Sequence, residues 1–216
     1  MSSEQDHTIE LHEGVWLDLN QPIFFQSTDG KPGQARTLVK LRAQEEQLEV
    51  QFSCLDDPHW SSNTYTEHNT DLWRQEVFEI FIAAGNQVPH RYLELEINPN
   101  NAFFAAWVEN RSGQGPEKLT MLTHEQHGIR HSVETAADHW KGSIHIPLAL
   151  LGTDNSAGYR LNFYRIVLRD KPADQNWECA PENCDFLCWQ STLSGDQPAF
   201  HRPKHFGSLR IATGQE

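Results

Sequence analysis

Apolar and polar residues alternate with the period of a β-strand in the segment 91–98, Arg-Tyr-Leu-Glu-Leu-Glu-Ile-Asn. One face of this strand is apolar and is formed by Leu93, Leu95 and Ile97. The opposite face carries Tyr92, Glu94, Glu96 and Asn98. We predict that the apolar face lies in a core. The polar face is either the solvated side of an antiparallel sheet or a surface that hydrogen-bonds a polyhydroxylated ligand.

Other segments with strand character follow at short intervals, with almost no helical period between them. The expected strands are residues 37–42, 48–55, 76–82, 91–98, 102–108, 129–135, 140–146, 159–168 and 206–212. This pattern predicts an all-β fold, a single antiparallel β-sandwich of immunoglobulin-like or jelly-roll type. Between its two sheets we expect to find Leu93, Leu95, Ile97, Ile144, Ile146 and Phe163.

The 216 residues show no linker-like break, so we expect one domain over residues 13–216. Residues 1–12 are polar and predict a flexible N-terminal arm. Residues 118–128 are ambiguous, 147–152 predict a single turn, and 170–185 predict an irregular excursion.

The composition limits the classes of partner. The net charge is −13, and no cluster of Lys and Arg is present to neutralise phosphates or to bind an anionic membrane. We therefore expect no nucleic acid and no membrane partner, but a neutral ligand or a cation. The sequence shows no signal-peptide pattern and no apolar run that could cross a bilayer. As given, it predicts a cytoplasmic protein, or a periplasmic or secreted one if a leader was removed.

Several motifs together resemble a known family. Trp73 followed six residues later by Glu79, and then a strand ending in Glu96-Ile97-Asn98, resembles the ligand-binding core of family 9 carbohydrate-binding modules and their DOMON-like relatives. The segments 162–165, 189–192 and 200–209 resemble the closing strands of that family, and the likeness runs from about Trp16 to Ile211. The resemblance implies a β-sandwich that binds a saccharide without catalysing a reaction on it.

The resemblance also implies a site. Trp73 and Phe200 would form an aromatic platform for a sugar ring, although the family usually has Trp at the position of Phe200. Glu79 and Asn98 match positions that hydrogen-bond sugar hydroxyls, and Glu96 stands where the family has arginine. Tyr92 and Arg165 are expected as neighbours.

This site requires a bend in the chain between Trp73 and Glu79. In a straight strand Trp73 and Glu79 would lie about 20 Å apart, so the chain must bend before Glu76 if both are to touch one sugar. If Trp73 is instead an ordinary core residue, the platform does not exist.

Metals and cofactors are less clearly indicated. The family often carries structural calcium, for which the Asp56-Asp57 and 170–174 loops are candidates. The spaced residues His124, His127 and His131 are interpreted as surface histidines. No haem is expected, because its ligation in such relatives needs a methionine and the only internal one is Met121.

The cysteine loop leaves three alternatives open for Cys179, Cys184 and Cys188. Free thiols are favoured, with one disulfide or a zinc site completed by His201 and His205 as the others.

The acidic residues Glu79, Glu94 and Glu96 also raise the question of glycoside hydrolysis. The sequence marks none of them as a buried acid and contains no nucleophile or phosphate-loop motif. We therefore predict a non-catalytic binding module for a carbohydrate or similar small polar ligand, with a role accessory to the hydrolysis of glycosides. The alternative is a cytoplasmic domain that keeps the fold, has lost its ligand site and acts in protein interaction.

Overall fold

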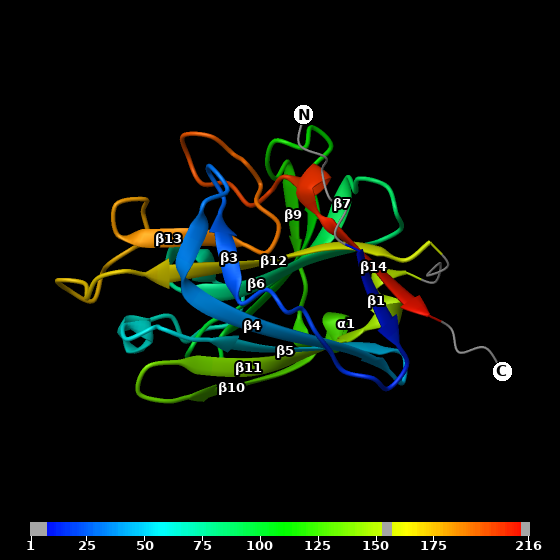
Figure 1. Cartoon of the computed structure of the whole chain (residues 1–216), viewed down its shortest axis with the longest axis horizontal. Helices are drawn as coiled ribbons and strands as arrows, with labels where there is room; N and C mark the ends of the chain where they lie inside the picture. Colours follow the sequence, from blue (N-terminus) through cyan, green and yellow to red (C-terminus); the bar gives the residue numbers. More distant parts are fainter. Residues whose placement is uncertain (1–7, 153–156, 213–216) are drawn as a thin grey trace.

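The computed structural model describes residues 8–152 and 157–212, and strands dominate it (Figure 1). In chain order the strands are β1 (Thr8–His12), β2 (Leu17–Asp18), β3 (Ile23–Gln26), β4 (Pro32–Gln44), β5 (Gln47–Cys54), β6 (Val77–Ala84), β7 (Arg91–Ile97), β8 (Phe103–Glu109), β9 (Lys118–Met121), β10 (Arg130–Thr135), β11 (Trp140–Pro147), β12 (Tyr159–Leu168), β13 (Cys184–Cys188) and β14 (Gly207–Ala212). The helical elements are short turns: α1 (His124–His127), α2 (Leu148–Leu151), η1 (Trp60–Ser62), η2 (Leu72–Arg74) and η3 (Pro203–His205). No helix within the described ranges is long and apolar enough to cross a membrane.

The strands form two layers that are joined through the long strand β4. The first layer contains β10, β11, β5 and the second part of β4, and the second layer contains β3, β13, β12, β6, β7, β8 and β9. The order of hydrogen-bonded strands is β10-β11-β5-β4-β3-β13-β12-β6-β7-β8-β9. The second part of β4 pairs with β5 over Thr37–Gln44, whereas its first part pairs with β3. In Figure 1, β4, β5, β11 and β10 lie in the lower half and β13, β12 and β6 in the upper half. The predicted all-β sandwich is confirmed.

The core between the layers follows the alternation of the sequence. Phe78 in β6 lies opposite Ile97 in β7, and its ring stacks on Phe52 of the other layer with centroids 4.2 Å apart. All six residues expected in this core have no exposed surface: Leu93, Leu95, Ile97, Ile144, Ile146 and Phe163. The sequence prediction of the core is therefore confirmed.

Part of the predicted N-terminal arm is a β-strand. Residues 8–12 form β1, which pairs with β14 as a parallel strand, and residues 1–7 lie outside the described residues. Ile9 and Leu11 are buried because the alternation of β1 points both toward the core. The prediction of a flexible arm over 1–12 is wrong for residues 8–12.

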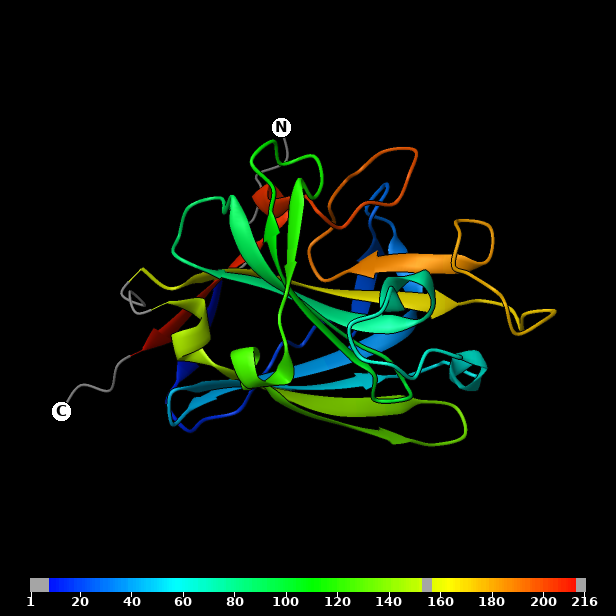
Figure 2. The ribbon, with the colours of Figure 1, turned by 180° about the vertical axis from the view of Figure 1, so that it is seen from behind.

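The outer face of the second layer is covered, and this positions the site. A second apolar cluster on that face includes Phe81 of β6, Tyr92 of β7 and Tyr164 of β12. Loop residues such as Leu72, Trp177 and Phe200 pack against it. In Figure 2, seen from behind, the green loop between β8 and β9 and the orange loop after β13 rise above the strands of this layer. The interpretation of this polar strand face as solvated is therefore wrong.

Candidate functional site

A cavity of about 650 Å³ opens on the outer face of the second layer. Its floor is made by side chains of β6, β7, β8 and β12, and its walls come from the loops at residues 69–73, 114–116 and 198–201. Four of the predicted site residues line it: Trp73, Glu79, Glu96 and Phe200. This volume suits a small ligand.

Three carboxyl groups form the polar part of the floor. Glu79 in β6 lies directly opposite Glu96 in β7, and Glu94 lies two residues before Glu96 on the same strand face. Residues in such register have Cβ atoms only about 4.5–5.5 Å apart. Their exposed fractions are 2%, 0% and 5% for Glu79, Glu96 and Glu94. The sequence had placed Glu94 on this face but not among the site residues.

The surroundings favour the protonated form of all three groups. Burial raises the pKa of Glu94 to about 8. The pKa values of Glu79 and Glu96 rise well above the usual range, mainly through burial and then through the neighbouring carboxylates. The backbone of Trp73 lowers the pKa of Glu96 in part. A protonated carboxyl offers a donor as well as an acceptor, so this floor can bond ligand hydroxyls in both directions.

The floor also has unused hydrogen-bonding capacity. Neither carboxyl oxygen of Glu96, nor Oε1 of Glu79, has a hydrogen-bonding partner of normal geometry among the described residues. A buried polar atom without a partner costs about 1–3 kcal/mol, and native proteins keep few of them. A ligand that enters the cavity would supply the missing partners.

Trp73 reaches the cavity because the chain bends where the sequence required it. The turn η2 (Leu72–Arg74) ends in Gln75, and the backbone N–H of Gln75 donates to the carbonyl of Leu72. The bend carries Trp73 back over the start of β6, so it lines the same cavity as Glu79. The side chain is 48% exposed, whereas its neighbour Leu72 is fully buried. Trp73 is therefore not a core residue.

Phe200 occupies the opposite kind of environment. Its ring is 8% exposed and stacks on Tyr164 of β12, with centroids 4.5 Å apart and planes at 21°. The Tyr164 hydroxyl donates to the carbonyl oxygen of Phe200, which fixes the loop on the sheet. Phe200 is therefore a fixed part of the cavity wall, whereas Trp73 is half-exposed and has the guanidinium of Arg74 over its ring, 5.1 Å from the ring centroid.

The rim of the cavity is apolar. Leu119 and Met121 of β9 are 48% and 40% exposed and line the cavity together with Phe104 of β8. No role is predicted for Leu119 from the sequence, because the secondary structure of residues 118–128 is ambiguous there. Met121, which was considered only as a haem ligand, is a rim residue.

His201 is a further wall residue, which the sequence suggested only as a zinc ligand. Its Nε2 lies 3.6 Å from Oε1 of Glu94, and its Nδ1 lies 2.7 Å from the Tyr92 hydroxyl. Burial lowers the pKa of His201 to about 4, so the ring is neutral at pH 7 and does not balance the charge of a carboxylate. Tyr92 itself stands behind His201, does not line the cavity, and accepts a bond from Asn110.

Besides Tyr92, two predicted site residues do not line the cavity. Asn98 is buried and does not line the cavity, because its amide bonds the carbonyl of Tyr65 and the side chain of Asn63. Arg165 has no exposed surface and lies between the two layers, since its partner in register is the core residue Phe78. Its guanidinium binds Asp57 at 2.8 Å. Placing Arg165 beside the site was wrong.

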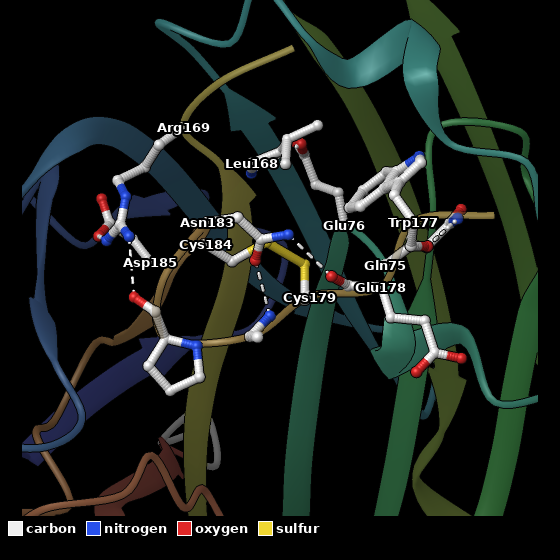
Figure 3. Close-up of a disulfide and its surroundings, with 12 residues drawn as sticks. Gln75, Glu76, Leu168, Arg169, Trp177, Glu178, Cys179, Asn183, Cys184 and Asp185 are labelled. Atoms are coloured by element: carbon white, nitrogen blue, oxygen red, sulfur yellow. Dashed lines mark hydrogen bonds and ion pairs between the residues drawn. A yellow bond between two sulfur atoms is a disulfide. The ribbon is translucent and has the colours of Figure 1, made fainter. Parts of the chain in front are cut away.

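The cysteine loop is closed by a disulfide between Cys179 and Cys184, shown in Figure 3. Asn183 supports it by donating to the carbonyl of Glu178 and accepting from the backbone N–H of Ala180. The favoured prediction of free thiols is wrong for this pair. Cys188 is a free, buried thiol, and the zinc alternative loses two of its ligands.

Comparisons with known proteins agree with this architecture. No family model matches the chain. A fungal protein from Arthroderma benhamiae, named an extracellular protein, is 31% identical over 159 residues, which are 68% of this chain and 71% of the relative. The chain belongs to the same family as this fungal protein.

Solved structures extend the comparison to the fold. A proposed carbohydrate-binding protein from Bacteroides uniformis matches with a TM-score of 0.67 at 14% identity, over 95% of this chain and 98% of that one. A family 9 carbohydrate-binding module from Caldicellulosiruptor kristjanssonii matches with a TM-score of 0.55 in its glucose complex and 0.54 in its cellotriose complex, both at 14% identity. These two cover 97% of this chain and 98% and 96% of theirs. The chain thus has the fold of a family 9-like domain, as the resemblance predicted.

Calcium, which the resemblance suggested, does not fit the first of the two candidate loops. Asp56 is held by Arg36 through bonds of 2.7 and 2.9 Å, and Asp57 is held by Arg165. In the second loop Asp174 accepts from the backbone of Asn176. No group of three His, Cys, Asp or Glu side chains in the described part of the chain is arranged for a metal ion.

Proposed function

We propose that this domain is a non-catalytic saccharide-binding module whose ligand enters the cavity over β6 and β7. The observation that carries the proposal is the pairing of an exposed indole, Trp73, with buried carboxyl oxygens of Glu79 and Glu96 that have no hydrogen-bonding partner in the part of the chain that the structure describes. Sugars have apolar C–H faces that stack on aromatic rings and hydroxyls that need directed partners. The cavity presents both kinds of surface within one space.

The comparisons support this proposal. Structures with the same fold include a family 9 carbohydrate-binding module in complex with glucose and with cellotriose. In this chain the aromatic contacts would come from Trp73 and the edge of Phe200, and Leu119 and Met121 would cover the outer end of the ligand. Glu79, Glu94 and Glu96 would exchange hydrogen bonds with hydroxyls on the inner side.

A hydrolytic role is less well supported by the same carboxyls. Glycosidases need one protonated acid and one carboxylate that stays ionised. Here burial raises the pKa of all three groups, and the neighbouring histidine is neutral. No lysine or arginine among the described residues lines the cavity to hold any of them in the ionised form, so the site favours binding over bond cleavage.

Two observations support a role in an oxidising compartment. Structural disulfides such as Cys179–Cys184 persist mainly outside the reducing cytoplasm. The fungal relative is named an extracellular protein. We therefore propose an extracytoplasmic location in place of the cytoplasmic one that the sequence alone suggested.

The test is a binding screen of the whole chain with mono- and oligosaccharides, read by thermal shift and calorimetry. Ligand at 100 times its Kd should stabilise the protein by about 2.7 kcal/mol and raise its Tm. If no saccharide binds at millimolar concentration, the proposal fails. A protein-interaction role would then be the better account of the fold.

A further inference from the structure

The titratable side chains that line the cavity are mostly acidic. Its lining includes four acidic side chains, Asp71, Glu79, Glu94 and Glu96, and neither lysine nor arginine is among the described residues that line it. Two arginines that follow lining residues directly in the chain are already engaged. Arg74 binds both Asp71 and Glu178 at 2.9 Å, and Arg202 donates to the backbone carbonyl of Gln114. The three glutamates of the floor therefore have no cationic partner among these side chains.

These acids are costly to bury without a partner. Glu79 and Glu96 stand opposite each other in the sheet, where like charges destabilise a strand pair. Three of their four carboxyl oxygens lack a hydrogen-bonding partner among the described residues, and Glu96 has no exposed surface. A neutral sugar can be bound by amides and hydroxyls as well as by carboxyls, so it does not require three buried acids. A cluster of buried carboxyls is explained better by a ligand that brings positive charge.

A protonated primary amine matches the floor of the cavity in its number of hydrogen-bond donors and in its charge. An ammonium group has three donors and no acceptor, so it can bond one oxygen from each of several carboxylates. Its charge removes the repulsion between Glu79 and Glu96. The indole of Trp73 also lines the cavity, and an aromatic ring can attract a cation through its face or stack on sugar C–H groups. The guanidinium of Arg74 already lies over this ring, 5.1 Å from its centroid, so the ligand would share the indole with Arg74.

We infer that the cavity selects an amino sugar with a free, protonated amine, and that Glu96 determines this preference. The inference rests on the proposed function, because it names the class of saccharide for the same site. Glu96 is assigned this role because it has no exposed surface and neither of its carboxyl oxygens has a hydrogen-bonding partner among the described residues.

Ligand comparison with the whole chain at pH 7 tests the inference. Glucosamine, N-acetylglucosamine and glucose share one ring and differ in charge at one position. Glucosamine should bind at least about tenfold more tightly than the other two, as expected for hydrogen bonds between charged groups. Its binding should also release protons, seen as a calorimetric enthalpy that changes with the ionisation enthalpy of the buffer.

Variants separate the charge from the shape of the site. Glu96→Gln should bring glucosamine down to the affinity of glucose, and Glu96→Arg should exclude glucosamine while glucose still binds. Glu134→Gln is the matched control, because Glu134 is an exposed residue of β10 in the other layer. Glu79→Gln serves as a second variant should Glu96→Gln not fold.

The outcomes distinguish the two proposals. Equal binding of glucose and glucosamine by the unmodified chain overturns the amine inference and leaves the saccharide-binding function standing. The same holds if Glu96→Gln and Glu79→Gln both keep the preference. Failure of every saccharide, charged or neutral, overturns the proposed function and the inference together.

Discussion

Trp73 allows a clear experiment at the scale of a single residue, because a platform and a packing residue respond differently to truncation. Its side chain is 48% exposed, so Trp73→Ala should leave the Tm nearly unchanged. Saccharide affinity should fall at least about tenfold, since the stacked face is lost. Trp140→Ala is the control: Trp140 is fully buried and bonds Asp57, so its loss should cost about 3–5 kcal/mol. A comparable fall in Tm for Trp73→Ala would contradict the platform.

The raised pKa of Glu94, about 8, predicts how stability depends on pH. Glu79 and Glu96 shift in the same direction. The folded protein then holds more protons than the unfolded chain above about pH 4.5, so the free energy of unfolding falls as pH rises toward 8. His201, whose pKa is lowered to about 4, and the other histidines with lowered pKa oppose this only below about pH 6.5.

Between about pH 6.5 and 8, the change of the free energy of unfolding with pH therefore reflects the buried acids and not the histidines. Each carboxyl group that is protonated in the folded protein and ionised in the unfolded chain should lower the free energy of unfolding by about 1.4 kcal/mol per pH unit. Glu94→Gln should make the decline shallower by about that amount, as measured by urea unfolding at several pH values. Glu134→Gln should not change it. An unchanged slope in Glu94→Gln would show that the carboxyl of Glu94 is ionised in the folded protein.

Single residues also show what alternation can and cannot predict. Leu93, Leu95 and Ile97 were assigned to the core from parity alone, because a strand sends alternate side chains to opposite faces. Arg165 was misplaced because residues 159–168 are apolar on both faces and give no parity signal. Its orientation is visible only in the register, where it faces Phe78. Asn98 shares the parity of Glu96 but is drawn away by Asn63 and Tyr65, which lie more than thirty residues earlier.

At the scale of elements, the segment before β13 carries the next prediction. The disulfide Cys179–Cys184 closes a short loop, whose removal should cost about 2 kcal/mol in the chain-entropy account. Titration in denaturant without reductant should find two thiols, Cys54 and Cys188, of the four cysteines in the sequence. Neither should react in the native protein, because burial raises the pKa of both thiols. Four thiols in denaturant would refute the disulfide.

Most strands could be predicted, and the loops that make the site could not. The bounds of β12 match the expected 159–168, because strand character there is strong and continuous. The disulfide pairing is not set by spacing, since three cysteines within ten residues allow several pairings. The cavity itself depends on how the loops at 69–73, 114–116 and 198–201 pack over β6 and β7. These are long-range contacts, for which local pattern carries no information.

At the scale of the whole molecule, Arg165 joins the two layers that the sandwich depends on. From β12 its guanidinium donates to the carbonyls of Arg36 and Leu55 and binds Asp57 at 2.8 Å. Glu76 lies 3.8 Å away, and its pKa is raised mainly by burial and by Asp57. The positive charge of Arg165 thus compensates two buried acids at once.

Removing that charge should weaken the whole fold and leave the ligand site intact. Arg165→Met should lower the free energy of unfolding by about 3–5 kcal/mol, because the buried acids lose their counter-ion. Saccharide affinity of the folded fraction should not change, since Arg165 is on the core face of β12 and does not line the cavity. Urea unfolding and calorimetry below the transition measure the two effects separately. Lost affinity at unchanged stability would return Arg165 to the site, whereas lost stability at unchanged affinity assigns it to the joining of the two layers.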